Sequence, residues 1–189
     1  MTNIDSLKIY STNELNQLGY HSNLLTELTR QNQLTRVQRG FYIVNDGLDE
    51  LAMIVQLFPE GILCLSSALY FYDYLDHVPV YHTIAVTKNN NRYKYRHSDL
   101  NLKAYFRDDK YINVGVDLNG YKGHLIKVYD RERTICDCIR RRKLISNKEY
   151  KQAIQSYIAD PNKNMSRLRE YGELFRISEK LEFLFEVWI

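Results

Sequence analysis

Polar side chains between positions 22 and 30 recur at the spacing of one helical face. Asn23, Thr26 and Arg30 stand three and four residues apart, so in a helix they share one surface. Asparagine can pair with adenine, arginine with guanine, and threonine can contact a thymine methyl group or a phosphate. We therefore predict that these three residues read bases in a DNA groove, with Ser22 beside them as a phosphate contact.

Two arginines follow on a predicted hairpin. Residues 34–37 and 41–44 favour strands, and residues 38–40 between them form a turn that ends in a glycine. Arg36 on the first strand and Arg39 in the turn can reach phosphates or an adjacent minor groove. We expect both arginines to position the chain on a duplex.

Two predicted helices hold these residues in place. Ser11 and Glu14 have the spacing of a capping box, and the helix that they open ends at Gly19. Ser22 can cap a second helix, which has an apolar inner face. That face consists of Leu24, Leu25 and Leu28. A helix, a turn, a second helix and a hairpin are typical of a winged helix-turn-helix, which we predict over residues 1–46.

The small charge of this region leaves a second interpretation open. Residues 1–45 carry four basic and three acidic side chains, a net charge of only +1. So few charges imply few phosphate contacts, and therefore a need for a dimer on DNA or for help from the rest of the chain. A solvated helix face explains the same residues, and a winged helix can also be a protein-interaction module.

The rest of the chain, residues 47–189, is predicted to form an α+β domain. It combines a mixed or antiparallel sheet with C-terminal helices. Helices are expected over residues 49–58, 66–72, 130–143 and 147–158, and strands over residues 82–87, 102–106, 112–116 and 125–129. Asn119-Gly120 is expected to turn the last hairpin. The tail carries an apolar stripe that suits a core or a protein interface: Leu174, Ile177, Leu181, Leu184 and Trp188.

The composition permits nucleic acid as a partner without requiring it. The chain has 189 residues and a formal net charge of +3. Residues 88–110 have a net charge of +4 and residues 131–151 a net charge of +5, which suits either an acidic partner or a solvated surface. We find neither a signal-peptide pattern nor an apolar run of membrane length, so we expect a cytoplasmic protein with no membrane partner.

We predict no catalytic residue, no cofactor and no metal site. The sequence has no glycine-rich phosphate loop and neither a G-x-S-x-G nor an H-E-x-x-H motif. Cys136 and Cys138 lie two apart in a predicted helix, so they point in nearly opposite directions and one metal ion cannot easily take both. Asp117 and Lys127 could imitate part of a nuclease site, which keeps a nucleic-acid-processing enzyme as a further alternative.

Three segments, in this order, resemble motifs of the AbiEi family of antitoxins. They are LTRVQRGFY at residues 34–42, GILCLSSAL at residues 61–69 and YDRERTICD at residues 129–137. The Glu-Arg-Thr-x-x-Asp core of the third segment is the most specific part.

The resemblance implies an antitoxin of a type IV toxin–antitoxin system, which acts in abortive infection as a phage defence. Its winged helix would bind inverted repeats in its own promoter as a transcriptional repressor. The remaining domain would counteract a nucleotidyltransferase-like toxin, with or without direct contact.

Local helix chemistry also explains the third segment. Asp130 is placed to cap the helix, and Arg133 and Asp137 stand four residues apart and can pair. Thr134 can bond back to the start of the helix, and Glu132 suits the positive end of its dipole. We therefore expect this segment to be part of the structural framework.

Overall fold

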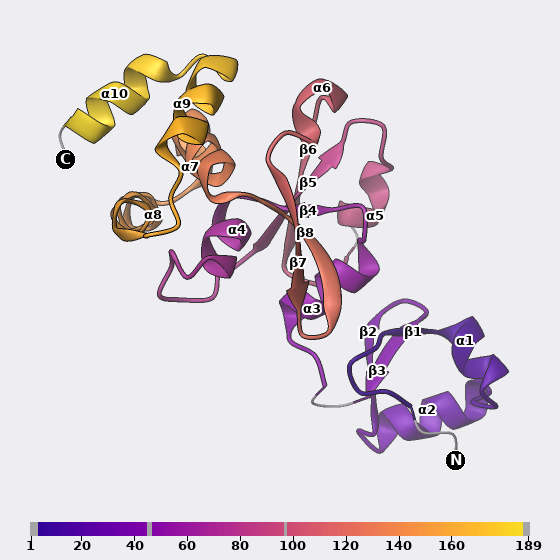
Figure 1. Cartoon of the computed structure of the whole chain (residues 1–189). Helices are drawn as coiled ribbons and strands as arrows, with labels where there is room; N and C mark the ends of the chain where they lie inside the picture. Colours follow the sequence, from indigo (N-terminus) through magenta and orange to yellow (C-terminus); the bar gives the residue numbers. More distant parts are fainter. Residues whose placement is uncertain (1–3, 45–46, 97, 187–189) are drawn as a thin grey trace. The chain divides into compact units, whose positions relative to one another are not determined.

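The computed structural model describes residues 4–44, 47–96 and 98–186, which form a mixed α+β fold with two sheets (Figure 1). The α+β class agrees with the prediction from the sequence. The chain forms two compact units. Unit 1 comprises Met1–Glu60, Asn91–Leu102 and Gly120–Ile126, and unit 2 comprises Gly61–Asn90, Lys103–Asn119 and Lys127–Ile189. The predicted domain boundary falls at Asn45 and Asp46, which lie outside the described residues.

Unit 1 begins with two helices and a three-stranded antiparallel sheet. The strand order is β1-β3-β2. The elements are β1 (Tyr10–Ser11), α1 (Thr12–Gln17), α2 (Ser22–Arg30), β2 (Leu34–Gln38) and β3 (Phe41–Val44).

The capping box of α1 forms as the sequence predicts. The Glu14 backbone N–H donates to Ser11 Oγ at 3.2 Å, and the Ser11 N–H donates to Glu14 Oε2 at 2.8 Å. Leu18 is the C-cap of the helix, and Gly19 follows in the left-handed conformation. The start of α1 is therefore fixed by its own side chains.

The predicted cap of α2 was wrong by one residue. His21 is the N-cap and makes no side-chain capping bond, and Ser22 is the first helical residue. Packing is the reason. Tyr20 is buried with Leu15 and Leu25, and its N–H donates to the Leu15 carbonyl at 2.8 Å, so the chain can enter the helix only after His21.

Both faces of the small sheet are covered within unit 1. One cluster, beneath α1 and α2, holds Tyr10, Leu15, Tyr20, Leu25 and Leu34. The other holds Ile9, Val37, Ile43, Leu48 and Ala52, the last from α3 (Glu50–Leu57). Successive side chains of a strand point to opposite faces, so β3 supplies both clusters.

The rest of unit 1 packs around α3. Asp49 caps α3 by accepting from the Ala52 N–H at 2.8 Å, and it also accepts from the Tyr121 hydroxyl at 2.7 Å. A short helix, α5 (Arg92–Arg96), is an element that the sequence did not predict. It is fixed by Tyr95, whose buried ring packs 5.3 Å from that of Phe58.

Unit 2 contains most of the five-stranded sheet, whose order is β6-β5-β4-β8-β7. β4 is antiparallel to β5 and parallel to β8, so the sheet is mixed. The strands are β4 (Ile62–Leu63), β5 (His82–Thr87), β6 (Leu102–Arg107), β7 (Val116–Tyr121) and β8 (His124–Tyr129). The helices are α4 (Leu65–Phe71), α6 (Asp109–Ile112), α7 (Arg131–Arg140), η1 (Arg142–Leu144), α8 (Asn147–Ala159), α9 (Met165–Leu174) and α10 (Ser178–Glu186).

Two predictions around the β7–β8 hairpin were wrong. The strand expected over residues 112–116 does not form: α6 covers residues 109–112 and β7 begins only at Val116. The hairpin turns at Lys122-Gly123 rather than at Asn119-Gly120. A tight two-residue turn needs positive φ at both positions, and Lys122 (φ 47°) and Gly123 (φ 82°) have it. Asn119 and Gly120 instead continue β7.

The predicted contacts at the start of α7 are confirmed. Asp130 accepts from the Arg133 N–H at 2.7 Å, Thr134 Oγ1 donates to the Tyr129 carbonyl at 3.1 Å, and Arg133 Nε lies 3.3 Å from Asp137 Oδ2. All four side chains of residues 130, 133, 134 and 137 are buried. Burial raises the pKa of the Asp130 carboxyl, against the hydrogen bonds that it accepts.

Glu132 does more than its predicted role at the helix dipole. It is buried, and its Oε1 accepts from the Tyr157 hydroxyl at 3.2 Å and from the Asn164 N–H at 2.7 Å. Tyr157 belongs to α8, and Asn164 is the N-cap of α9. One carboxylate therefore joins three helices.

The predicted apolar stripe of the tail does not lie on one helix. Leu174 ends α9 and is 43% exposed, while Ile177 and Leu181 are buried. Arg176 has a φ of 56°, so the chain turns there before α10 begins. Trp188 lies outside the described residues.

A substitution at Gly115 tests how closely the turn before β7 approaches α7. Its φ is +70°, and an added Cβ would lie 2.8 Å from Arg133 Cβ. We expect Gly115→Ala to lower the free energy of unfolding by about 2–4 kcal/mol, because backbone strain and a clash with a buried side chain act together. Urea denaturation measures this loss.

Gly120→Ala is the matched control. An added Cβ at Gly120 meets nothing within 4 Å, so its unfolding free energy should change little. Equal losses in the two variants would contradict the close approach at Gly115.

Glu14 provides a pH-dependent test of the α1 cap. Hydrogen bonds from the Ser11 backbone, from Lys8 and from the Ser11 side chain lower the pKa of Glu14 to about 2. A lowered pKa in the folded state stabilises the fold above the ordinary value near 4.5, and this stabilisation is lost as the pH falls towards 2. Glu14→Gln should lower the unfolding free energy by only about 0.5 kcal/mol at pH 6, because the group is half exposed.

Urea denaturation at pH 6 and at pH 2 measures this effect. The difference between Glu14→Gln and the wild type should shrink at pH 2, where the wild-type carboxylate is partly protonated. Glu27→Gln, an exposed change of the same kind, is the control. A difference that is the same at both pH values would exclude the charged cap as its cause.

Candidate nucleic-acid interface

The structure places the three predicted base-reading residues on one exposed surface of α2. Asn23, Thr26 and Arg30 are exposed, whereas Leu25 on the opposite side of the helix is 3% exposed. The amphipathic pattern in the sequence therefore sets the orientation of the helix.

Ser22 lies at the start of this surface. Because His21 supplies no side-chain cap, neither the Ser22 hydroxyl nor the first N–H groups of α2 have a capping partner among the described residues. The N-terminal end of a helix carries partial positive charge and suits a phosphate. The exposed His21 is adjacent, and no sequence pattern marks its position, since histidine is not a usual cap.

Side chains on the polar face of α2 are partly engaged with one another. The Thr26 hydroxyl donates to the Ser22 carbonyl at 2.9 Å, which leaves its oxygen as an acceptor and its methyl group for apolar contact. The Glu27 carboxylate accepts from the Gln31 amide at 3.0 Å. Arg30 has no such partner in the described part of the chain.

The two hairpin arginines are also exposed. A bulge interrupts the pairing of β2 with β3 between Arg36 and Gln38, so Arg36 faces solvent while the next residue, Val37, is buried. Arg39 lies in the turn. Among the described residues, no carboxylate lies within 4 Å of Arg30, Arg36 or Arg39, while Lys8 pairs with Glu14 at 2.9 Å. The three arginines that we predict to contact DNA therefore have no ion-pair partner among the described residues.

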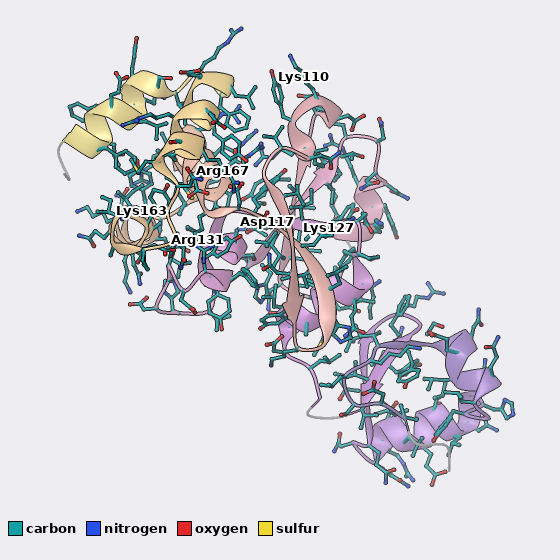
Figure 2. The ribbon with its side chains drawn as sticks, in the orientation of Figure 1. Lys110, Asp117, Lys127, Arg131, Lys163 and Arg167 are labelled. Carbon is teal, nitrogen blue, oxygen red and sulfur yellow. The ribbon has the colours of Figure 1, made fainter. Side chains whose placement is uncertain are left out.

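The two basic stretches do not form such a surface. Residues 88–110 are divided between the units, and Arg107 is buried. In the second stretch Arg133 is buried, and Arg131, which is labelled in Figure 2, pairs with Asp160, with 2.8 Å between Nε and Oδ2. Pairing and burial use much of their charge within the protein.

The other residues considered for chemistry are Asp117, Lys127 and the three cysteines. Asp117 and Lys127 are exposed on β7 and β8 (Figure 2), and no group of three acidic, histidine or cysteine side chains that could hold a metal ion is found in residues 4–44, 47–96 and 98–186. The three cysteines are buried, and burial raises the pKa of Cys64 and Cys136 to about 12. None of the described helices is long and apolar enough to cross a membrane.

The comparisons with known proteins concern the fold. No family model matches the sequence, and no curated protein matches it significantly. Among solved structures, the chain is similar to the crystal structure of the RV2827C protein from Mycobacterium tuberculosis, with a TM-score of 0.67 and 12% sequence identity. The match covers 87% of this chain but only 66% of that chain, so the similarity extends over slightly less than two thirds of its length.

Proposed function

We propose that residues 1–46 form a winged helix-turn-helix that binds duplex DNA, with α2 as the recognition helix and the β2–β3 hairpin as the wing. The order of the elements supports this proposal. β1, α1, α2, β2 and β3 follow one another, and β3 lies between the other two strands. In a helix-turn-helix the second helix enters the major groove, which is the position of α2 in this order.

The observation that carries the proposal is the exposed face of α2. It presents Asn23, Thr26 and Arg30, side chains that match base edges, and Arg30 is free of any ion pair in the described residues. Ser22 at the uncapped start of the helix, with Arg36 and Arg39 on the wing, is suited to phosphates.

We further propose that the protein is an antitoxin of a type IV toxin–antitoxin system, similar to the AbiEi family, and a repressor of its own promoter. The resemblance of residues 34–42, 61–69 and 129–137 supports this assignment. On this proposal it acts in the cytoplasm, binds inverted repeats as a dimer, and counteracts a nucleotidyltransferase-like toxin. A winged-helix protein-interaction module, or a regulator with no antitoxin role, is the alternative.

The DNA proposal is tested by two arginine variants. Arg30→Ala should weaken binding to promoter DNA about tenfold and binding to scrambled DNA much less, because a base contact is lost. Arg39→Ala should weaken binding to both duplexes alike and reduce the salt slope by about 1, because a phosphate contact is lost. Fluorescence anisotropy at several salt concentrations measures both effects.

Arg169→Ala, an exposed change on α9, is the control and should leave DNA binding unchanged. Equal losses on both duplexes for Arg30→Ala would remove Arg30 from the reading surface. If the wild type shows no salt-dependent DNA binding, the protein-interaction alternative is favoured.

The antitoxin proposal is tested separately in cells that express the toxin encoded beside this chain. Co-expression of the chain should restore growth. The double variant Arg30→Ala/Arg39→Ala should restore growth equally well while losing repression of a promoter reporter, because the proposed antitoxin action belongs to the rest of the chain. If the wild-type chain represses the reporter but does not restore growth, the alternative of a regulator without an antitoxin role is favoured.

A further inference from the structure

Three arginines lie within 4 Å of one buried carboxylate in unit 2, and a fourth, Arg141, follows on the same chain segment. The carboxylate is Asp137 on α7, whose side chain is 1% exposed. Its oxygens lie 3.3 Å from Arg133 Nε, 3.4 Å from Arg140 Nη1 and 3.9 Å from Arg107 Nη2. Good hydrogen bonds between guanidinium and carboxylate groups are about 2.7–2.9 Å long, so Asp137 is shared among its partners and fully satisfies none of them.

Arg133 finds its remaining partners elsewhere. Its Nη1 donates to the carbonyls of Tyr111 at 3.1 Å and Val114 at 3.3 Å. Its guanidinium carbon also lies 4.2 Å from the centre of the Phe175 ring. Arg133 is therefore satisfied by backbone carbonyls as well as by Asp137, and Asp137 has little capacity left for the other arginines.

Arg107 at the end of β6 is the unsatisfied member. It is 5% exposed, and both Nε and Nη2 are buried without a hydrogen-bond partner. These two nitrogens form one edge of the guanidinium, and their N–H bonds point the same way. That edge is the fork that binds a phosphate or a carboxylate side-on.

Arg141, just beyond α7, adds a third unpartnered donor. Its Nε is buried without a hydrogen bond, although the residue as a whole is half-buried. Both arginines adjoin Asp137: the Arg141 backbone N–H donates to the Asp137 carbonyl at 2.9 Å, and Arg107 Nη2 lies 3.9 Å from Asp137 Oδ2. Burial lowers the pKa of Arg141, and the positive charge of Arg107 lowers it further. No carboxylate within 4 Å pairs with Arg141 in the described residues.

The remaining neighbours do not balance the charge. Cys64 feels the charges of Arg107, Arg133, Arg141 and Asp137, and its buried thiol is neutral because burial raises its pKa to about 12. Tyr105, whose ring centre lies 5.6 Å from the Arg107 guanidinium, is likewise protonated. The cluster therefore holds four positive charges and one negative charge, and burial makes the excess costly for Arg107 and Arg133, which are both buried.

We propose that Arg107 and Arg141 form a binding site for a phosphate-type dianion at the end of α7. An oxyanion here would accept from the Nε–Nη2 edge of Arg107 and from Arg141 Nε, and would offset the excess charge. It would enter from the side of Arg140 and Arg141, whose side chains are partly exposed. A dianion with several acceptor oxygens suits two guanidiniums better than one carboxylate does. The site is independent of the proposed DNA contacts in unit 1.

Inorganic phosphate is the probe. The melting temperature of the full chain should rise saturably with phosphate at constant pH and ionic strength, because a ligand that binds only the folded state stabilises it. Phosphate also stabilises proteins by exclusion from their surface, and that effect rises without saturation. Arg107→Gln and Arg141→Gln should lose the saturable part, with affinity at least about tenfold weaker in calorimetry.

Lys143→Gln is the matched control. It removes one exposed charge from the same basic run and should keep the saturable rise. Arg141 is half-buried, so Arg141→Gln should fold even where Arg107→Gln does not, and calorimetry on the wild type needs no variant. A wild type without saturable phosphate binding, or variants that retain it, would overturn the proposal.

A nucleoside monophosphate distinguishes two sources of the anion. Tighter binding of the nucleotide than of inorganic phosphate would assign the site to a nucleotide, and equal or weaker binding would assign it to free phosphate. Binding of either probe supports the site if the Arg141→Gln variant loses that binding. Failure of both probes to bind would leave the charge imbalance to be met by water and would refute the site, whatever the outcome of the DNA experiments.

Discussion

The burial of both faces of one short strand controls the orientation of α2. Phe41 and Ile43 of β3 pack on the cluster that contains α3, while Tyr42 and Val44 pack on the cluster beneath α1 and α2. Because side chains alternate along a strand, a shift of one residue would move every one of them to the wrong face. The sheet therefore fixes where the leucines of α2 must dock, and the polar face of that helix is left pointing outward.

A comparable constraint acts on charge in unit 2. Asp130, Glu132, Arg133 and Asp137 are buried on one helix, and a buried charge is tolerated only where partners surround it. Those partners come from elsewhere: the Tyr171 hydroxyl donates to Asp130 at 2.8 Å, and α8 and α9 supply donors to Glu132. The need for partners thus draws several elements onto α7. The unpartnered donors of Arg107 and Arg141 are an exception to this rule, which is why we propose that an anion binds there.

The sequence predicted what depends on neighbours along the chain. The capping box at Ser11 and the Asp130 cap use residues three apart, so local spacing suffices. Prediction from the sequence failed where tertiary packing decides the structure. Asn119-Gly120 and Lys122-Gly123 can both form a turn, and only the pairing of β7 with β8 selects Lys122-Gly123. The inward position of Arg107 has no local signal, because a basic residue at a strand end is normally exposed. The outward face of α2 was predictable from periodicity, whereas the uncapped start at His21 was not.

The small charge of the proposed DNA-binding region limits how it can work. Each phosphate contact contributes about 0.9 to the salt dependence of binding, and Arg36, Arg39 and the start of α2 offer few such contacts in one copy. Non-specific affinity should then be low, and base contacts must supply a larger share of the binding free energy. Two copies on an inverted repeat would double those base contacts and raise the effective concentration of the second copy. Competing genomic sites would meanwhile hold each copy only weakly, so a low charge favours a repressor of one site over a protein that coats DNA.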